Sequence, residues 1–394
     1  MAEDASWTGR AAGRALDVAI AGTRGVPGRY GGFETFAEEL GAGLAARGHR
    51  VTVYGRVPYV GSTPFVHRGV RVVPVAGPGG KHLETPAHAL ATALAARGAG
   101  HDAVVLCNAV NAFVVPLLRA GGARVALAVD GADRLRRKWG LGGRLAYEVA
   151  ERLGVRLPDV AVADARCVAD DYLRRHGRRL PVIAYGADHL DPARADPALL
   201  ARWGLAPGRY ALVVGRLEPE NNALLVVRAW CAHVHAPLPL VVVGDAPHAD
   251  GYKAAVRRAA DPRRVVLTGG VYGPAYLALQ AFAACYVAAG EVGGTHPALI
   301  EAMHAGGPVV AHDVPEHREV LGDAGLYYDR DDAVGLAAAA DHLLADPAFA
   351  AGLRARARAR VDARYRWEDV VAAWEALLRG EGAGAVLGSG RRHP

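Results

Sequence analysis

The stretch LDVAIAGTRGVPGRYGGFETFAEELGAGLAARG occupies residues 16–48. It begins with a short apolar run, LDVAIAG (16–22), which predicts a buried strand. A glycine-rich loop follows, and FETFAEELGAGLAARG (33–48) then places apolar residues at helical spacing and stops at Gly48. A continuous apolar strand, a glycine loop and an amphipathic helix in this order are typical of a parallel sheet with helices on both faces.

The same alternation continues along the first half of the chain. Strands are predicted where short apolar runs occur: VTVYG (51–55), VRVVPV (70–75), DAVVLCN (102–108), ARVALAVD (123–130) and DVAVAD (159–164). Helices are predicted at ETPAHALATALAARG (84–98) and LGGRLAYEVAERLG (141–154). The apolar segment 103–118 is too short for a membrane span and predicts a buried strand followed by a helix.

The pattern restarts after a polar stretch that contains prolines. YALVVGR (210–216) opens a second series, with further strands predicted at LPLVVVG (238–244), RRVVLTGG (263–270), CYVAAG (285–290) and PVVAHD (308–313). We therefore expect an α/β fold of two doubly wound domains, with ligands in the cleft between them. The predicted units are a first domain at 1–190, a linker at 191–207, a second domain at 208–364, a final amphipathic helix at 365–380 and a flexible tail at 381–394.

The composition narrows the class of protein. The chain has 394 residues, 52% hydrophobic and 22% charged, which suits two domains with sizeable cores. Its net charge is +6, and basic residues are dispersed apart from the runs RLRRKWG (134–140) and RRHGRR (174–179). Neither run is interleaved with several aromatic residues, so we expect no nucleic-acid partner.

The cysteines and the N-terminus indicate the cellular compartment in which the protein works. Four cysteines lie far apart and form no CxxC pair: Cys107, Cys167, Cys231 and Cys285. This argues against a disulfide scaffold or a cysteine zinc site. MAEDASWTGR (1–10) carries acidic residues and no apolar segment, so it is not a signal peptide. We expect a cytoplasmic protein, with peripheral membrane association as an open alternative, that is monomeric or homodimeric.

The loop GTRGVPGRYGGFET (22–35) joins the first predicted strand to the first helix. Its glycines let backbone N–H groups at a helix N-terminus approach an anionic or carbonyl oxygen. It lacks the GxGxxG fingerprint and a Walker lysine, which counts against NAD binding and NTP hydrolysis. Its 11 residues from Gly22 to Gly32 exceed the usual length of about 2–6. This favours a binding loop over an ordinary turn.

VVGRLEPENN (213–222) places Arg216 at the end of the first strand of the second half. A guanidinium in the predicted cleft is suited to bidentate binding of a phosphate. The alternative is an ordinary surface arginine. Glu220 and Asn222 are candidates for capping the next helix.

AAGEVGGTHPALIEAMHAGGPVVAHD (288–313) contains a second glycine loop before a helix. Gly293, Gly294 and Thr295 are expected to present backbone N–H groups to a diphosphate, helped by the helix dipole. Glu301 lies about one turn into the helix, where a carboxylate can accept hydrogen bonds from vicinal ribose hydroxyls. Its apolar neighbours indicate a buried, paired carboxylate rather than a solvated one.

Four histidines lie near this loop: His296, His304, His312 and His317. They show no HExxH spacing and no cluster with carboxylates at metal-ligand spacing. We therefore expect neither a metal nor a cofactor in the site.

Together these segments resemble the retaining glycosyltransferases of the GT-B fold, family GT4, and most closely the bacterial rhamnosyltransferase-like (DUF1972-type) subgroup. The resemblance covers residues 16–380. It rests on five segments in order: GTRGVPGRYGGFETFAEEL, VDGADRLRRKWG, IAYGAD, LEPENN and VGGTHPALIEAMHAGGPVVAHD. It implies two Rossmann-like domains, the first on the acceptor side and the second binding a nucleotide sugar. It also implies that the final helix crosses back to the first domain.

The resemblance implies roles for individual residues. Gly31 and Gly32 would lie against the donor phosphates or the acceptor, and Arg216 would neutralise the leaving diphosphate. Glu301 would bind the ribose, and Asp130 lies where relatives often place a histidine near the transferred sugar. The expected catalytic residues are Asp130, Arg216 and Glu291, and the expected donor-binding residues are Gly31, Gly32, Asn221, Val271, Tyr272, Gly293, Gly294, Thr295 and Glu301.

The chain departs from the family's pattern at three places. The general family has two glutamates separated by seven residues, but here Gly293 holds the first position and Glu291 lies two residues earlier. Asn221 stands where the family has a lysine that binds the diphosphate. Residues 288–290 are Ala-Ala-Gly where the subgroup tends to have His-Gly-His. Rhamnose is therefore not assumed as the sugar.

The expected function is transfer of a hexosyl unit from a UDP-, dTDP- or GDP-sugar to a hydroxyl, with the retention of configuration that the resemblance implies. The acceptor is a glycan precursor or a natural product. Two alternatives stay open: another GT-B enzyme, such as a sugar-nucleotide epimerase or hydrolase, and a non-catalytic sugar-nucleotide-binding subunit. RLRRKWG (134–140), with Trp139, either contacts a lipid-linked acceptor at a membrane surface or forms a solvated helix edge.

Overall fold

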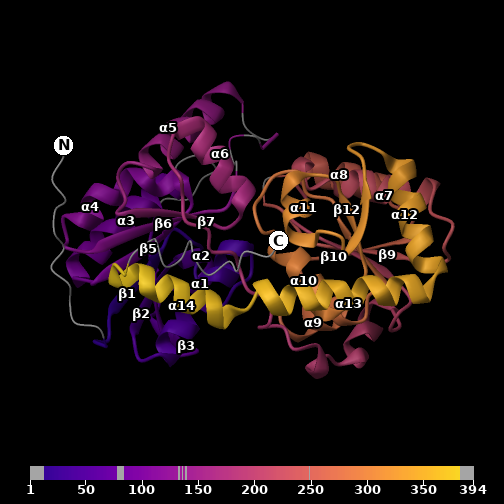
Figure 1. Cartoon of the computed structure of the whole chain (residues 1–394), viewed down its shortest axis with the longest axis horizontal. Helices are drawn as coiled ribbons and strands as arrows, with labels where there is room; N and C mark the ends of the chain where they lie inside the picture. Colours follow the sequence, from indigo (N-terminus) through magenta and orange to yellow (C-terminus); the bar gives the residue numbers. More distant parts are fainter. Residues whose placement is uncertain are drawn as a thin grey trace, which may run out of the picture.

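The computed structural model describes residues 13–77, 84–131, 134, 136–137, 140–247 and 249–381. It contains two α/β domains side by side, each built around a largely parallel sheet with helices on both faces (Figure 1). The predicted pair of doubly wound, Rossmann-like domains is confirmed.

The first domain holds a sheet whose described strands run in the order β3-β4-β2-β1-β5-β6-β7. Neighbouring strands pair in parallel except β3, which is antiparallel to β4. The strands are β1 (Asp17–Ala21), β2 (Arg50–Arg56), β3 (Phe65–His67), β4 (Val70–Val75), β5 (Ala103–Cys107), β6 (Arg124–Val129) and β7 (Val160–Ala163). The helices are α1 (Gly32–Ala46), α2 (Val57–Val60), α3 (Glu84–Ala99), α4 (Val115–Arg119), α5 (Leu141–Gly154) and α6 (Arg166–His176).

The second domain holds a parallel sheet in the order β10-β9-β8-β11-β12-β13. Its strands are β8 (Ala211–Val214), β9 (Leu240–Val243), β10 (Val265–Gly269), β11 (Cys285–Ala288), β12 (Val309–His312) and β13 (Gly325–Tyr328). Its helices are α7 (Ala223–Ala232), α8 (Asp250–Ala259), α9 (Pro274–Ala281), α10 (Pro297–Ala305), α11 (Pro315–Leu321), α12 (Ala333–Ala345) and α13 (Pro347–Arg364). Pro297 opens α10 at its first position, where its missing N–H costs no hydrogen bond.

The last helix, α14 (Trp367–Arg379), lies against α1 of the first domain (Figure 1). The ring of Trp374 packs on Phe36 with centroids 5.3 Å apart. Arg47 Nη1 lies 2.9 Å from Glu375 Oε2 at the edge of this contact. The chain therefore leaves the second domain through α13, and α14 packs on the first domain.

Apolar packing is continuous between the domains. The buried cluster that contains Ile20 and Phe36 of the first domain also contains Leu299, Val309 and Trp367. This shared core fixes the walls between which the functional site lies. In the part of the chain that the structure describes, no helix combines the length and the apolar character that crossing a membrane requires.

Candidate functional site

A cavity of about 1210 Å³ lies between the two domains. Asp130 and Asp164 of the first domain line it directly after strands β6 and β7. Gly215 and Ala289 of the second domain line it directly after β8 and β11. The cavity thus opens at the carboxyl ends of both sheets, which is where doubly wound folds bind ligands.

Most of the residues singled out from the sequence meet at this cavity. Those that line it are Gly31, Gly32, Asp130, Arg216, Asn221, Val271, Tyr272, Gly293, Gly294 and Glu301. Two others, Glu291 and Thr295, are not among the residues that line it. Their individual roles toward a donor stay predictions.

The glycine loop before α10 lets the two domains touch. A Cβ added to Gly131 would lie 2.8 Å from the carbonyl carbon of Gly293, and Gly131 has a φ of +130°. A Cβ added to Gly294 would overlap the carboxylate of Asp164. Glycine is needed at Gly131 and Gly294 because backbone and side chain of the opposite domain fill the space where a side chain would stand.

Asp164 binds this loop from the first domain. The backbone N–H of Thr295 donates to Asp164 Oδ2 at 2.9 Å, and the Thr295 hydroxyl donates to the Asp164 carbonyl at 2.5 Å. The Thr295 N–H, which the sequence assigns to a diphosphate, is therefore engaged across the domain boundary. Burial raises the pKa of the Asp164 carboxyl to about 7, although the Thr295 N–H opposes this. Within the described residues, Oδ1 has no hydrogen-bond partner.

Glu301 is 5% exposed and holds two polar partners. The Tyr276 hydroxyl donates to its Oε2 at 2.5 Å, and His189 Nε2 lies 3.4 Å from its Oε1. Gln280 in turn donates to the Tyr276 hydroxyl at 2.7 Å. The expectation of a buried, paired carboxylate is confirmed.

His189 connects this carboxylate to the start of α14. The indole N–H of Trp367 donates to His189 Nδ1 at 3.0 Å. Because an indole N–H is only a donor, His189 Nδ1 is the acceptor and Nε2 carries the proton that faces Glu301. Burial lowers the pKa of His189, but the Glu301 carboxylate outweighs it and the net shift is upward. Sequence reasoning missed His189, because no short-range pattern links it to Glu301 or Trp367.

Arg216 lies near an aromatic ring and a carboxylate. Its Nη1 is 3.6 Å from Glu218 Oε2, and its guanidinium carbon is 5.9 Å from the centroid of the Tyr30 ring. The Asn221 amide donates to the Arg216 carbonyl at 2.7 Å, which ties this neutral side chain to the backbone of the strand end. Arg24 stacks 3.2 Å over the same Tyr30 ring.

Glu291 is held by cations outside the cavity. Arg137 Nη2 donates to both of its oxygens at 2.7 and 2.9 Å, and Arg330 Nη2 donates to Oε2 at 3.3 Å. The Asn222 amide donates to Oε1 at 3.0 Å. These contacts occupy the carboxylate, and its catalytic role stays a prediction.

The run RLRRKWG lies only in part within the described residues, since Leu135, Lys138 and Trp139 fall outside them. Of its described arginines, Arg137 is exposed and Arg136 is not. Arg136 is 8% exposed, lines the cavity, and donates to Glu220 Oε1 of the second domain at 3.4 Å.

Two of the histidines around the loop, His296 and His317, line the cavity and contact each other. The rings of His296 and His317 lie 4.6 Å apart, and burial lowers the pKa of both, for His317 to about 4. Across the described ranges, no three side chains of the types His, Cys, Asp and Glu come together as metal ligands would.

Comparisons with known proteins agree with this architecture. Residues 31–186 match the family model described as "Glycosyl transferase 4-like domain", and residues 208–346 match "Glycosyl transferases group 1". A phosphatidyl-myo-inositol mannosyltransferase from Mycolicibacterium smegmatis is 33% identical over 208 residues, which are 50% of this chain and 53% of that protein. The match thus spans about half the length of this curated relative.

Solved structures share the fold. A sucrose-phosphate synthase from Thermosynechococcus elongatus is 20% identical with a TM-score of 0.75, covering 93% of this chain and 99% of that one. HepE from Anabaena, solved with UDP-glucose, is 16% identical with a TM-score of 0.72, covering 93% and 100%. The two matched models and the shared fold identify this chain as a glycosyltransferase of the GT4 type with the GT-B architecture.

Proposed function

We propose that this protein transfers a hexosyl unit from a UDP-, dTDP- or GDP-linked sugar to a hydroxyl acceptor, with retention of configuration and without a metal ion. The main support for this proposal is that Arg216 and Glu301 of the second domain line the same cavity as residues of the first domain. Those residues are Gly31, Gly32 and Asp130. A relative named as a mannosyltransferase and a fold neighbour solved with UDP-glucose support a hexosyl donor without choosing the sugar.

The roles follow from the chemistry of each group. Glu301 accepts hydrogen bonds from the ribose, and Arg216 stabilises the charge that develops on the diphosphate as the sugar leaves. The bond from the anomeric carbon to the phosphate oxygen breaks, and a bond from that carbon to the acceptor oxygen forms on the same face. The acceptor proton passes to the departing phosphate, so no protein nucleophile is needed. The protein supplies position and charge.

The acceptor dependence of donor consumption tests this proposal. The full chain is incubated with UDP-, dTDP- and GDP-hexoses, with and without a panel of hydroxyl acceptors, and nucleoside diphosphate release is measured. We expect release that depends on the acceptor and a product whose NMR spectrum shows the donor's anomeric configuration. Rapid consumption without acceptor would instead indicate a hydrolase or epimerase, and donor binding without turnover a non-catalytic subunit.

Arg216 gives a sharper test of the site. Arg216→Ala removes a charged donor that acts on the leaving group, which should cost about 2–4 kcal/mol in the transition state, or roughly 30- to 1000-fold in kcat. Arg263→Ala is the matched control, because Arg263 is exposed and pairs with Asp261 away from the cavity. Equal turnover in the two variants removes Arg216 from the mechanism.

A further inference from the structure

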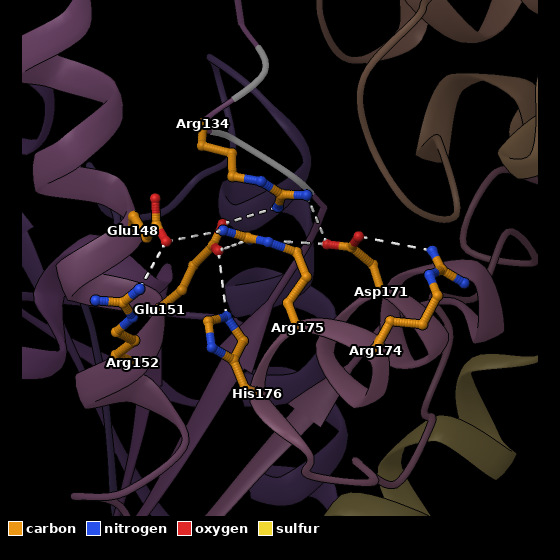
Figure 2. Close-up of polar contacts among 8 residues, drawn as sticks. All are labelled: Arg134, Glu148, Glu151, Arg152, Asp171, Arg174, Arg175 and His176. Atoms are coloured by element: carbon orange, nitrogen blue, oxygen red, sulfur yellow. Dashed lines mark hydrogen bonds and ion pairs between the residues drawn. The ribbon is translucent and has the colours of Figure 1, made fainter.

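The chain between β6 and α5 carries three described arginines, Arg134, Arg136 and Arg137, which we call the basic arm. Its base is fixed on the first domain. Arg134 Nη1 lies 3.2 Å from Glu151 Oε1, and its Nη2 lies 2.8 Å from Asp171 Oδ2 (Figure 2). The arm therefore starts from a defined position.

Glu151, at the centre of this anchor, is a buried carboxylate with several cationic partners. Its side chain is 2% exposed, and Arg175 and His176 of α6 contact it together with Arg134 (Figure 2). A buried carboxylate with this many charged hydrogen-bond partners holds them in place, because losing one leaves uncompensated charge. The anchor thus links Arg134 of the arm to α5 and α6.

Arg136 reaches the second domain. Its Nη1 lies 3.4 Å from Glu220 Oε1 and 3.9 Å from Glu218 Oε2. The same oxygen of Glu218 lies 3.6 Å from Arg216 Nη1. Two guanidiniums from opposite domains therefore meet at one carboxylate, and both line the cavity.

Arg137 attaches the arm at a second point. Its bidentate contact with Glu291 lies outside the cavity, and its side chain is 42% exposed. The two neighbouring arginines thus differ: Arg136 faces the cavity, while Arg137 holds the outer surface of the second domain.

A departing nucleoside diphosphate carries negative charge on several acceptor oxygens, so a second guanidinium beside Arg216 can add charge-assisted hydrogen bonds to it. Asn221 is neutral, and its amide is bound to the Arg216 carbonyl. We propose, resting on the function proposed above, that Arg136 is a donor-binding residue whose guanidinium joins Arg216 on the donor diphosphate. Glu218 and Glu220 hold that guanidinium in position. The positive charge for the leaving group then comes from both domains.

Binding of nucleotides of different charge tests this inference. The affinity of the full chain for UDP, GDP and dTDP, and for uridine, guanosine and thymidine, is measured by calorimetry in wild type, Arg136→Gln, Arg137→Gln and Arg216→Ala. Wild type is expected to bind one of the diphosphates. We expect Arg136→Gln to lower the affinity for that diphosphate by about 10- to 100-fold, as for a lost hydrogen bond to a charged group. The matching nucleoside should bind with unchanged affinity, and Arg137→Gln should retain diphosphate binding, since an exposed pair contributes little.

A double variant separates charge at the ligand from damage to the protein. Arg136→Gln leaves the buried Glu220 without the guanidinium that it pairs with, so Arg136→Gln/Glu220→Gln is measured as well. The inference requires the diphosphate loss to persist in the double variant. Recovery there, an equal loss in Arg137→Gln, or a loss that extends to the nucleoside would each overturn it.

The same data distinguish this inference from the proposed function. If wild type binds none of the three diphosphates, the proposed function fails and the inference fails with it. Wild type can instead bind one of the diphosphates. If Arg216→Ala then lowers the affinity for that diphosphate while Arg136→Gln leaves it unchanged, only the inference about Arg136 is overturned.

Discussion

Asp164 shows how single residues join the two domains of this glycosyltransferase. Asp164 directly follows β7 of the first domain, and its carboxylate accepts a hydrogen bond from the Thr295 N–H of the second. Burial raises its pKa from 3.8 to about 7, so the folded protein holds a proton that the unfolded chain releases above about pH 4. The raised pKa means that this group stabilises the fold fully below about pH 4. That contribution is lost as the pH rises to about 7.

Asp164→Asn should remove this dependence, because an amide keeps an oxygen for the Thr295 N–H and does not titrate. Relative to the variant, the free energy of unfolding of wild type should fall between pH 4 and 7 by on the order of 4 kcal/mol. Urea unfolding at several pH values measures it. Asp170→Asn, at an exposed position of α6, is the control and should follow wild type. A difference between wild type and Asp164→Asn that does not change with pH would contradict the assignment.

Residues within one motif were predictable, and residues that meet across the fold were not. Arg216 and Glu301 follow strand ends or glycine loops, so their positions at the cavity follow from local pattern. Asp164 and Thr295 are separated by 131 positions, and no periodicity links them. Arg136 belongs to a basic run whose sequence is equally compatible with a solvated helix edge.

Among the elements, α14 and α1 pack directly on each other although they are far apart in the sequence. Gly43 lies in α1, and a Cβ there would overlap Val371 of α14. Because glycine has no side chain, α14 can pack directly on α1 at Gly43. The contact thereby ties α14 to the domain that carries Asp130 and Asp164.

Gly43→Ala should therefore destabilise the protein by about 1–3 kcal/mol through overpacking, despite the better helix propensity of alanine. Gly352→Ala in α13 is the matched control, since a Cβ there meets nothing within 4 Å. That variant should gain about 0.4–1 kcal/mol. Chemical denaturation measures both. A Gly43→Ala protein as stable as Gly352→Ala would mean that α14 does not pack on α1 in this way.

Some elements were predicted to the residue, while several short ones and the longer helices α6, α12 and α13 were not predicted. The predicted strand at 70–75 and the predicted helix at 141–154 coincide with β4 and α5. The strands β3 (65–67) and β13 (325–328) and the helix α2 (57–60) were not predicted. Three or four residues carry too little periodicity to indicate an element, and such segments are ordered by the neighbours they pair with.

At the scale of the whole molecule, the cavity exists because two sheets turn their carboxyl ends toward each other. The alternation of strands and helices predicted both sheets and the cleft. The distance between the domains was not predictable, because it is set by tertiary contacts. Gly131 against Gly293, Asp164 on Thr295, and α14 on α1 together determine how closely the two walls approach.

The central claim is that this cavity binds a nucleotide-sugar donor. The most direct test is a thermal-shift panel of nucleoside diphosphates and nucleoside-diphosphate hexoses. Wild type, Glu301→Gln and the exposed control Glu368→Gln are compared, each with the ribonucleotide and its 2′-deoxy form. At a ligand concentration of about 100 Kd, a bound donor stabilises the fold by about 2.7 kcal/mol. We predict that one nucleotide sugar raises the Tm of wild type and of Glu368→Gln. Glu301→Gln should show a smaller rise and lose the preference for the ribonucleotide. No shift with any nucleotide, or an unchanged preference in Glu301→Gln, would contradict this account.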